Sequence, residues 1–129
     1  MIKTILLYEK DTICSKIYAE FFEQQGFNTI CVTTIDEFLS SIKSQPIDVI
    51  ITDAKILLNS ATDFFNHIQR LSDSHPIIFL SEKKYSSQLK EKIAPATHKT
   101  IEKPVTLIQM LSVVNHEINE FKNYSTDPF

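Results

Sequence analysis

Five short apolar runs alternate with five helical patterns along the 129 residues of this chain. The apolar runs, which are rich in β-branched residues, cover residues 3–8, 28–32, 47–52, 77–80 and 99–101. Apolar residues recur at helical spacing in residues 12–25, 35–42, 61–72, 84–93 and 107–121. Strands that alternate with helices pair in parallel, because each helix carries the chain back to the start of the sheet. The pattern therefore predicts an α/β domain with helices on both faces of its sheet.

The connections between the strands restrict the topology further. Parallel strands joined through a helix form right-handed crossovers, and a common solution at this size is the flavodoxin-like (βα)5 three-layer sandwich. Its strand order is 2-1-3-4-5, which places the first and third strands side by side. We expect one domain over residues 1–121, followed by a polar C-terminal tail over residues 122–129.

Two of the helical patterns predict which face of the helix is buried. Ile13, Ile17 and Phe21 are spaced by four and predict the inward face of the first helix. Gly26 follows, at a position where helix C-termini favour glycine. The last helix is expected to start after Pro104, a natural first-turn residue, and to bury Leu107, Leu111, Val114, Ile118 and Phe121.

Composition narrows the class of protein. A net charge of -3 gives no basic face for nucleic acid, and no apolar stretch reaches the roughly 18 residues that cross a membrane. The start of the chain runs directly into a strand and lacks the layout of a signal peptide. Two cysteines, Cys14 and Cys31, are too few for a disulfide framework. We therefore expect a cytoplasmic protein with reduced thiols.

Charged and hydroxyl side chains follow four of the predicted strands. Glu9 and Lys10 follow the first strand, Asp53 ends the third, Ser81 follows the fourth and Lys103 follows the fifth. In open α/β sheets, ligands bind at the carboxyl ends of the strands, near the point where the strand order reverses. We therefore expect Glu9, Lys10 and Asp53 to meet at that edge. Taken alone, Asp53 also fits a turn or cap residue, Ser81 a helix N-cap and Glu9 half of a salt bridge.

These motifs and their order resemble those of response-regulator receiver domains, the CheY-like family of two-component signalling, over about residues 3–121. The resemblance implies that Asp53 accepts a phosphoryl group from a histidine kinase and holds Mg²⁺ together with Glu9. It further implies that Ser81 contacts the phosphoryl group and that Lys103 pairs with it. The bond between Lys103 and Pro104 is often cis in this family. Family members often bind partners through the face formed by residues 84–93, 99–101 and 107–121, and a homodimer through this face is one expectation.

The chain departs from the family pattern at three places. Lys10 stands where the family usually has a second acid, and Thr100 stands where an aromatic switch residue is common. Residues 56–61, in the loop expected after Asp53, lack the usual Pro and Gly. An acid at position 10 would give the pocket three carboxylates, whereas Glu9, Lys10 and Asp53 together carry a charge of -1. Phosphoryl transfer depends on charge neutralisation by a metal, so Mg²⁺ binding and Mg²⁺-dependent phosphorylation are expected to be impaired.

The sequence leads to three candidate functions. The first is a stand-alone receiver that is not an enzyme, that needs no cofactor, and that acts by contact with a kinase or a downstream target. In this candidate the ammonium groups of Lys10 and Lys103 pair with Asp53 and Glu9. The second is a competent phosphoacceptor at Asp53. The third is a small α/β phosphatase or cofactor-binding enzyme, although residues 53–55 lack a phosphatase's second acid and one glycine cannot form a glycine-rich phosphate loop.

Overall fold

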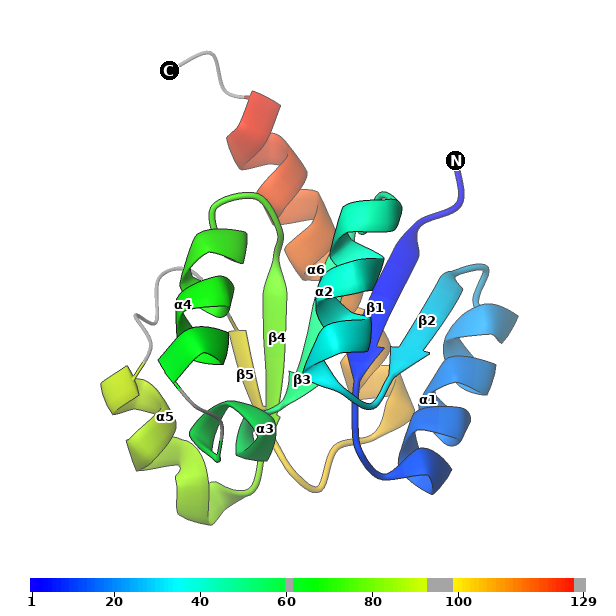
Figure 1. The fold of residues 1–129 in the computed structure, drawn as a ribbon. Helices are drawn as coiled ribbons and strands as arrows, with labels where there is room; N and C mark the ends of the chain where they lie inside the picture. Colours follow the sequence, from blue (N-terminus) through cyan, green and yellow to red (C-terminus); the bar gives the residue numbers. More distant parts are fainter. Residues whose placement is uncertain (60–61, 93–98, 127–129) are drawn as a thin grey trace.

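The computed structural model describes residues 1–59, 62–92 and 99–126, and its centre is a parallel sheet of five strands. The strands are β1 (Thr4–Tyr8), β2 (Asn28–Val32), β3 (Val49–Asp53), β4 (Ile77–Ser81) and β5 (Lys99–Glu102). Neighbouring strands all pair in parallel, in the order β2-β1-β3-β4-β5 (Figure 1). The predicted order 2-1-3-4-5 is confirmed, with β1 and β3 side by side.

Helices cover both faces of the sheet and give the three predicted layers (Figure 1). One face carries α1 (Thr12–Gln24) and α6 (Leu107–Thr126), whose buried side chains share one hydrophobic core. The other face carries α2 (Ile35–Ser44), α3 (Ala54–Leu58), α4 (Thr62–Leu71) and α5 (Ser86–Lys92), which share a second core. Within the part of the chain described above, no helix is both long enough and apolar enough to cross a membrane.

Strand β3 shows why an apolar run forms the middle of this sheet. Val49, Ile50 and Ile51 are fully buried, and successive side chains of a strand point to opposite faces. Ile50 enters the core on the side of α2 and α4, whereas Val49 and Ile51 enter the core on the side of α1 and α6. A strand buried on both faces needs a continuous apolar run, and this run ends at the carboxylate of Asp53.

The predicted inward face of α1 is wrong for Ile13 and Ile17, whereas Phe21 packs partly against the core as predicted. Ile13 and Ile17 are 72% and 50% exposed, whereas Phe22 is fully buried and Tyr18 packs partly against the core. Phe22 makes an edge-on ring contact with Phe27, with ring centres 5.8 Å apart. The larger aromatic side chains remove more apolar area from water than the isoleucines do, so the aromatic stripe faces the sheet. The backbone then turns after the helix at Gly26, whose φ of 93° fits the predicted C-terminal glycine.

The segment after Asp53 is a short helix where the sequence analysis expected a loop. Helix α3 begins at Ala54, and the Asp53 side chain caps it by accepting a hydrogen bond from the backbone N–H of Lys55 at 2.8 Å. Ile56 and Leu57 are buried in the core on this side of the sheet. Their apolar character therefore reflects packing. Residues 60–61 of the predicted loop lie outside the described residues.

The ends of three other helices differ from the predicted ends. The predicted helix over residues 84–93 consists of a 3-10 turn, η1 (Lys83–Tyr85), followed by α5, and residue 93 lies outside the described residues. Helix α4 spans Thr62–Leu71 within the predicted 61–72, and residue 61 is likewise not described. Helix α6 begins at Leu107, where the Thr106 hydroxyl accepts a hydrogen bond from the backbone N–H of Gln109 at 3.0 Å, and it continues beyond the predicted end to Thr126.

Candidate functional site

The carboxyl ends of the central strands open into one pocket of about 430 Å³, which we call the Asp53 pocket. Glu9 comes from the end of β1, Asp53 from the end of β3 and Lys103 from the turn after β5. Strands β1 and β3 pair up to Tyr8 and Thr52, so the residues that follow these two lie next to each other. The lining residues are Glu9, Lys10, Asp11, Cys14, Asp53, Lys55, Ile56, Asn59, Glu82 and Lys103.

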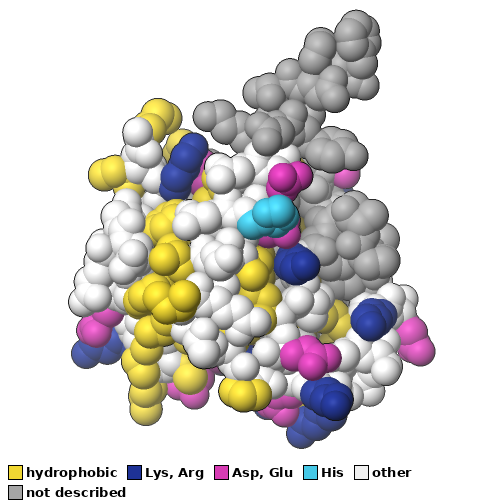
Figure 2. All heavy atoms as spheres, turned by 180° about the vertical axis from the view of Figure 1, so that it is seen from behind, with side chains coloured by type: hydrophobic (Ala, Val, Ile, Leu, Met, Phe, Trp, Pro, Cys, Tyr) yellow, Lys and Arg dark blue, Asp and Glu magenta, His cyan; other side chains and the backbone are white. Residues whose placement is uncertain are grey.

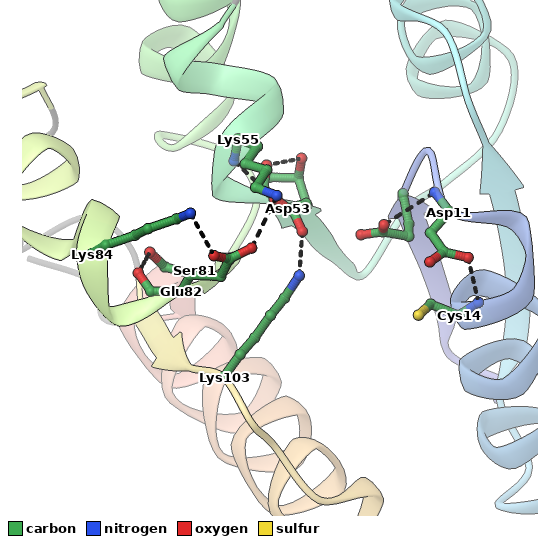
Figure 3. A network of polar contacts seen from close by, with 10 residues as sticks. Asp11, Cys14, Asp53, Lys55, Ser81, Glu82, Lys84 and Lys103 are labelled. Carbon is green, nitrogen blue, oxygen red and sulfur yellow. Dashed lines mark hydrogen bonds and ion pairs between the residues drawn. The ribbon is translucent and has the colours of Figure 1, made fainter.

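Both carboxylate oxygens of Asp53 are engaged. Oδ1 accepts the hydrogen bond from the backbone N–H of Lys55, and Oδ2 accepts a charge-assisted hydrogen bond from the Lys103 ammonium (Figure 3). Asp53 is 7% exposed as a residue, so this ion pair is shielded from bulk water on the Asp53 side. Asp53 is therefore a helix cap and a pocket residue at once, and the two readings of the sequence do not exclude each other.

The backbone around Lys103 directs its ammonium into the pocket. The N–H of Lys103 donates to the carbonyl oxygen of Ser81 at 2.8 Å, and the peptide bond between Lys103 and Pro104 is cis, as the resemblance implies. Burial alone would lower the pKa of the Lys103 ammonium. The hydrogen bond and the charge of Asp53, with a further contribution from Glu9, outweigh burial and raise this pKa. Lys103 therefore stays charged beside Asp53.

Glu9 is the second buried carboxyl of the pocket, with 7% of its surface exposed. Its Oε1 accepts a hydrogen bond from the backbone N–H of Asp11 at 3.1 Å. Burial is the main cause that raises the pKa of Glu9, and the nearby negative charge of Asp53 raises it further. The attraction of Lys103 and the hydrogen bond from Asp11 oppose this shift without cancelling it. The two carboxyls therefore lie near each other at the adjacent ends of β1 and β3.

The predicted ion pair between Lys10 and Asp53 is wrong. Lys10 is exposed at the rim of the pocket and forms no ion pair with any described residue. Glu9 still donates its N–H to the carbonyl oxygen of Val32, so it continues the strand geometry of β1. Since successive side chains of an extended chain point in opposite directions, Glu9 turns inward and Lys10 turns outward. Lys103 alone fills the position predicted for two ammonium groups.

Ser81 lies close to the site but is not part of the pocket lining. It is 1% exposed at the end of β4, and its hydroxyl donates to the carbonyl oxygen of Glu82 at 2.9 Å. The residue at the N-cap position of η1 is Glu82, and its side chain makes no cap hydrogen bond. The alternative reading of Ser81 as a helix N-cap is therefore wrong.

A second group of charges at the pocket rim was not anticipated from the sequence. The Lys55 ammonium lies 2.9 Å from Oε1 of Glu82, and the Lys84 ammonium lies 3.5 Å from Oε2 of the same carboxylate (Figure 3). The hydrogen bond to Glu82 raises the pKa of Lys55, and the hydrogen bond from Lys55 lowers the pKa of Glu82. Glu82 directly follows β4 and Lys55 is the second residue after β3, so the same strand-end rule that finds Asp53 could have found them.

The residues present do not fit a complete Mg²⁺ site. Mg²⁺ needs a near-octahedral shell of oxygen ligands, which usually includes one or two free carboxylates. Both oxygens of Asp53 already accept hydrogen bonds, and one oxygen of Glu9 accepts another. Across residues 1–59, 62–92 and 99–126, no group of three or more His, Cys, Asp or Glu side chains is arranged to hold a metal ion.

Comparison with known proteins agrees with this geometry. A model of the response regulator receiver domain matches residues 5–115. A CheY-like receiver domain protein from Methanospirillum hungatei JF-1 superposes with a TM-score of 0.81 at 19% identity, over 96% of this chain and 99% of that one. A receiver domain protein from Clostridium thermocellum gives a TM-score of 0.78 at 22% identity, over 95% and 99% of the two chains.

A response regulator receiver protein from Sinorhizobium medicae WSM419 is similar to the same extent, with a TM-score of 0.76 at 21% identity over 92% and 95% of the two chains. No curated protein matches this chain significantly. The solved structures share the fold, and the family match covers the strands and strand ends from which the Asp53 pocket is built. The chain therefore belongs to the response regulator receiver domain family of two-component signalling.

Proposed function

We propose that this chain is an atypical receiver domain that signals by contact with other proteins and whose Mg²⁺-dependent phosphorylation on Asp53 is impaired. The observation that carries the proposal is the ion pair between Lys103 and Asp53, in a pocket where Lys10 replaces an acid. A divalent cation at Asp53 has to compete with an ammonium that is already hydrogen-bonded there. It also meets the charge of Lys10 at the rim, where an acid would have supplied oxygen ligands.

The surface beside the pocket supports a function in protein contact. Ile13 and Ile17 of α1 and Ile108 of α6 are 72%, 50% and 69% exposed, and both helices cover the same face of the sheet. Figure 2 views the molecule from behind and shows hydrophobic side chains gathered in a band on this face. Asp11 and Cys14 at the start of α1 line the pocket, so a partner on this band lies next to Asp53. A histidine kinase or a downstream target fits this position.

The remaining parts of the proposal concern location and self-association. The two cysteines in the structure are free thiols, which supports a reducing compartment such as the cytoplasm.

Lys99 and Thr100 leave the outer edge of β5 exposed, which supports a homodimer through the face of α5, β5 and α6 as a second mode of contact. Sedimentation analysis over a range of protein concentrations tests the dimer, and a monomer at all concentrations contradicts it.

Treatment with acetyl phosphate and Mg²⁺, followed by intact-protein mass spectrometry, tests the main proposal. We expect the wild-type chain to show no stoichiometric adduct of about 80 Da. Substitution Lys10→Asp is expected to increase the adduct, because it returns an acid to the pocket rim. A stoichiometric wild-type adduct that is lost in Asp53→Asn contradicts the proposal and establishes the competent phosphoacceptor in its place.

A further inference from the structure

Three charged side chains and one aromatic ring lie together at the pocket rim. We call them the rim cluster: Lys55, Glu82, Lys84 and Tyr85. Both oxygens of the Glu82 carboxylate have a lysine partner, at 2.9 Å from Lys55 and 3.5 Å from Lys84. The two ammonium groups lie 5.9 Å and 5.2 Å from the centre of the Tyr85 ring, respectively. Figure 3 shows the carboxylate of Glu82 between the two lysines, close to Asp53. One carboxylate therefore restrains two lysine side chains.

The link between Lys55 and Glu82 joins two neighbouring strand ends beside Asp53. Asp53 of β3 pairs with Leu80 of β4. Lys55 lies two residues after Asp53, and Glu82 lies two residues after Leu80. Lys55 and Glu82 both line the Asp53 pocket, whereas Lys84 does not. The backbone N–H of Lys55 also donates to Oδ1 of Asp53. The Lys55 backbone is thus hydrogen-bonded to Asp53, and the Lys55 side chain is turned toward Glu82.

Three lysines line the pocket, and two of them, Lys55 and Lys103, pair with carboxylates of different exposure. The Lys103 ammonium pairs with the buried carboxylate of Asp53, whose side chain is 10% exposed. The Lys55 ammonium pairs with a carboxylate that is 36% exposed, and Lys55 itself is 46% exposed. A surface ion pair of this kind exchanges partners at small cost. Of these two lysines, Lys55 is therefore the one that can turn into the pocket while the Lys103–Asp53 pair stays intact.

We propose that Glu82 controls the binding of oxyanions in the Asp53 pocket by holding Lys55 at the rim. In the closed state, Lys55 pairs with Glu82. When a tetrahedral oxyanion such as phosphate enters, Lys55 leaves Glu82 and pairs with the anion, while Lys84 remains beside Glu82. Lys55 is then the ligand-binding residue and Glu82 a positioning residue. This inference deepens the proposed function and rests on it, since it concerns how an Asp53 pocket with impaired Mg²⁺ binding receives an oxyanion.

Titration with inorganic phosphate tests the inference, with binding followed by NMR at the backbone amides of Lys55 and Glu82 at constant ionic strength. We expect Glu82→Gln to bind phosphate about threefold more tightly than wild type, because Lys55 is no longer held by a carboxylate. Lys55→Met is expected to weaken phosphate binding. The double variant Lys55→Met/Glu82→Gln should bind phosphate no more tightly than Lys55→Met alone. Glu91→Gln on α5 is the matched control, since it removes the same charge from an exposed position outside the pocket.

An equal gain in Glu82→Gln and Glu91→Gln contradicts the inference, because the gain then reflects net charge alone. A gain from Glu82→Gln that persists in the Lys55→Met background contradicts it as well, as does the lack of measurable phosphate binding in Glu82→Gln. The titration needs neither Mg²⁺ nor phosphorylation. Stoichiometric phosphorylation of the wild type therefore contradicts the proposed function alone, and an unchanged phosphate affinity in Glu82→Gln contradicts this inference alone.

Discussion

Two of the carboxyls that line the pocket, Glu9 and Asp53, are buried and have different hydrogen-bond partners. Asp53 has a lysine ammonium and a backbone N–H as hydrogen-bond partners, whereas Glu9 has the backbone N–H of Asp11 and faces the negative charge of Asp53. Both residues are 7% exposed, so water does little to offset this difference. The ionised form of Glu9 is therefore poorly stabilised, and Glu9 is a pocket residue at which pH should affect folding.

Substitution Glu9→Gln is predicted to stabilise the chain at neutral pH. Burial, followed by the charge of Asp53, raises the pKa of Glu9 above its ordinary value of 4.5. An acid whose pKa is higher in the folded state stabilises the fold while it is protonated, and this contribution is lost as pH rises through the folded-state pKa. Glutamine keeps the neutral shape at every pH. The free energy of unfolding of Glu9→Gln should therefore exceed that of wild type near pH 7, and the difference should shrink as pH falls toward 4.5.

Urea unfolding at a series of pH values measures this difference. Glu20→Gln is the control, because Glu20 is exposed on α1 and outside the pocket, and its effect should not follow the same pH window. If the difference between Glu9→Gln and wild type is independent of pH, Glu9 is not the titrating group.

The sequence predicts the residues of the pocket better than it predicts their contacts. Glu9, Asp53 and Lys103 could be found because the residue after a parallel strand lies at the same edge as the residues after its neighbours. Which of the two predicted lysines, Lys10 or Lys103, pairs with Asp53 could not be decided in this way, because it depends on which way each side chain points. Lys10 and Lys103 are equivalent as charges in the sequence, yet one turns outward and the other reaches Asp53.

At the scale of single elements, spacing alone did not determine the buried face of α1. The helix has isoleucines at one i, i+4 spacing and aromatic residues on an adjacent stripe, and both stripes fit an amphipathic helix. Packing against Phe27 and the α6 side chains buries the aromatic stripe. In the same way, the short apolar stretch after Asp53 gave no helical repeat long enough to predict α3. Capping by Asp53 and burial of Ile56 and Leu57 form that helix.

The two stripes of α1 should differ sharply in their effect on stability. Ile17→Gln is expected to change the free energy of unfolding by no more than about 0.5 kcal/mol, because Ile17 is half exposed. Phe22→Ala is expected to lower it by about 3–5 kcal/mol, because it removes a fully buried ring and leaves a cavity. Chemical denaturation of the two variants provides the measurement. A loss of several kcal/mol in Ile17→Gln means that the isoleucine stripe is buried after all.

At the scale of the whole molecule, the strand order is what brings the pocket together. Strand β1 lies between β2 and β3, so the chain changes direction of winding there, and the ends of β1 and β3 meet. This order could be predicted because right-handed crossovers leave few arrangements for five parallel strands. The same arrangement couples the pocket to the global fold, since Glu9, Asp53 and Lys103 come from three different strands or their ends. Any ion that binds there stabilises the folded chain as a whole.

The global stability of the wild-type chain is therefore predicted to be nearly independent of Mg²⁺. An ion that binds the folded state alone raises the free energy of unfolding by RT ln(1 + [L]/Kd), which is about 1.8 kcal/mol for 10 mM Mg²⁺ and a Kd of about 0.5 mM. With Lys103 on Asp53 and Lys10 at the rim, we expect a gain below about 0.3 kcal/mol. Lys10→Asp should show a larger gain, because the added carboxylate offers the ion another oxygen ligand.

Denaturant unfolding in MgCl₂ and in NaCl of equal ionic strength separates specific binding from screening by salt. Asp53→Asn in the Lys10→Asp background should abolish the gain, since it removes the central carboxylate. A gain near 1.8 kcal/mol in the wild type would mean that the ion displaces the Lys103 ammonium from Asp53. In that case the internal ion pair is not what limits phosphorylation of this pocket.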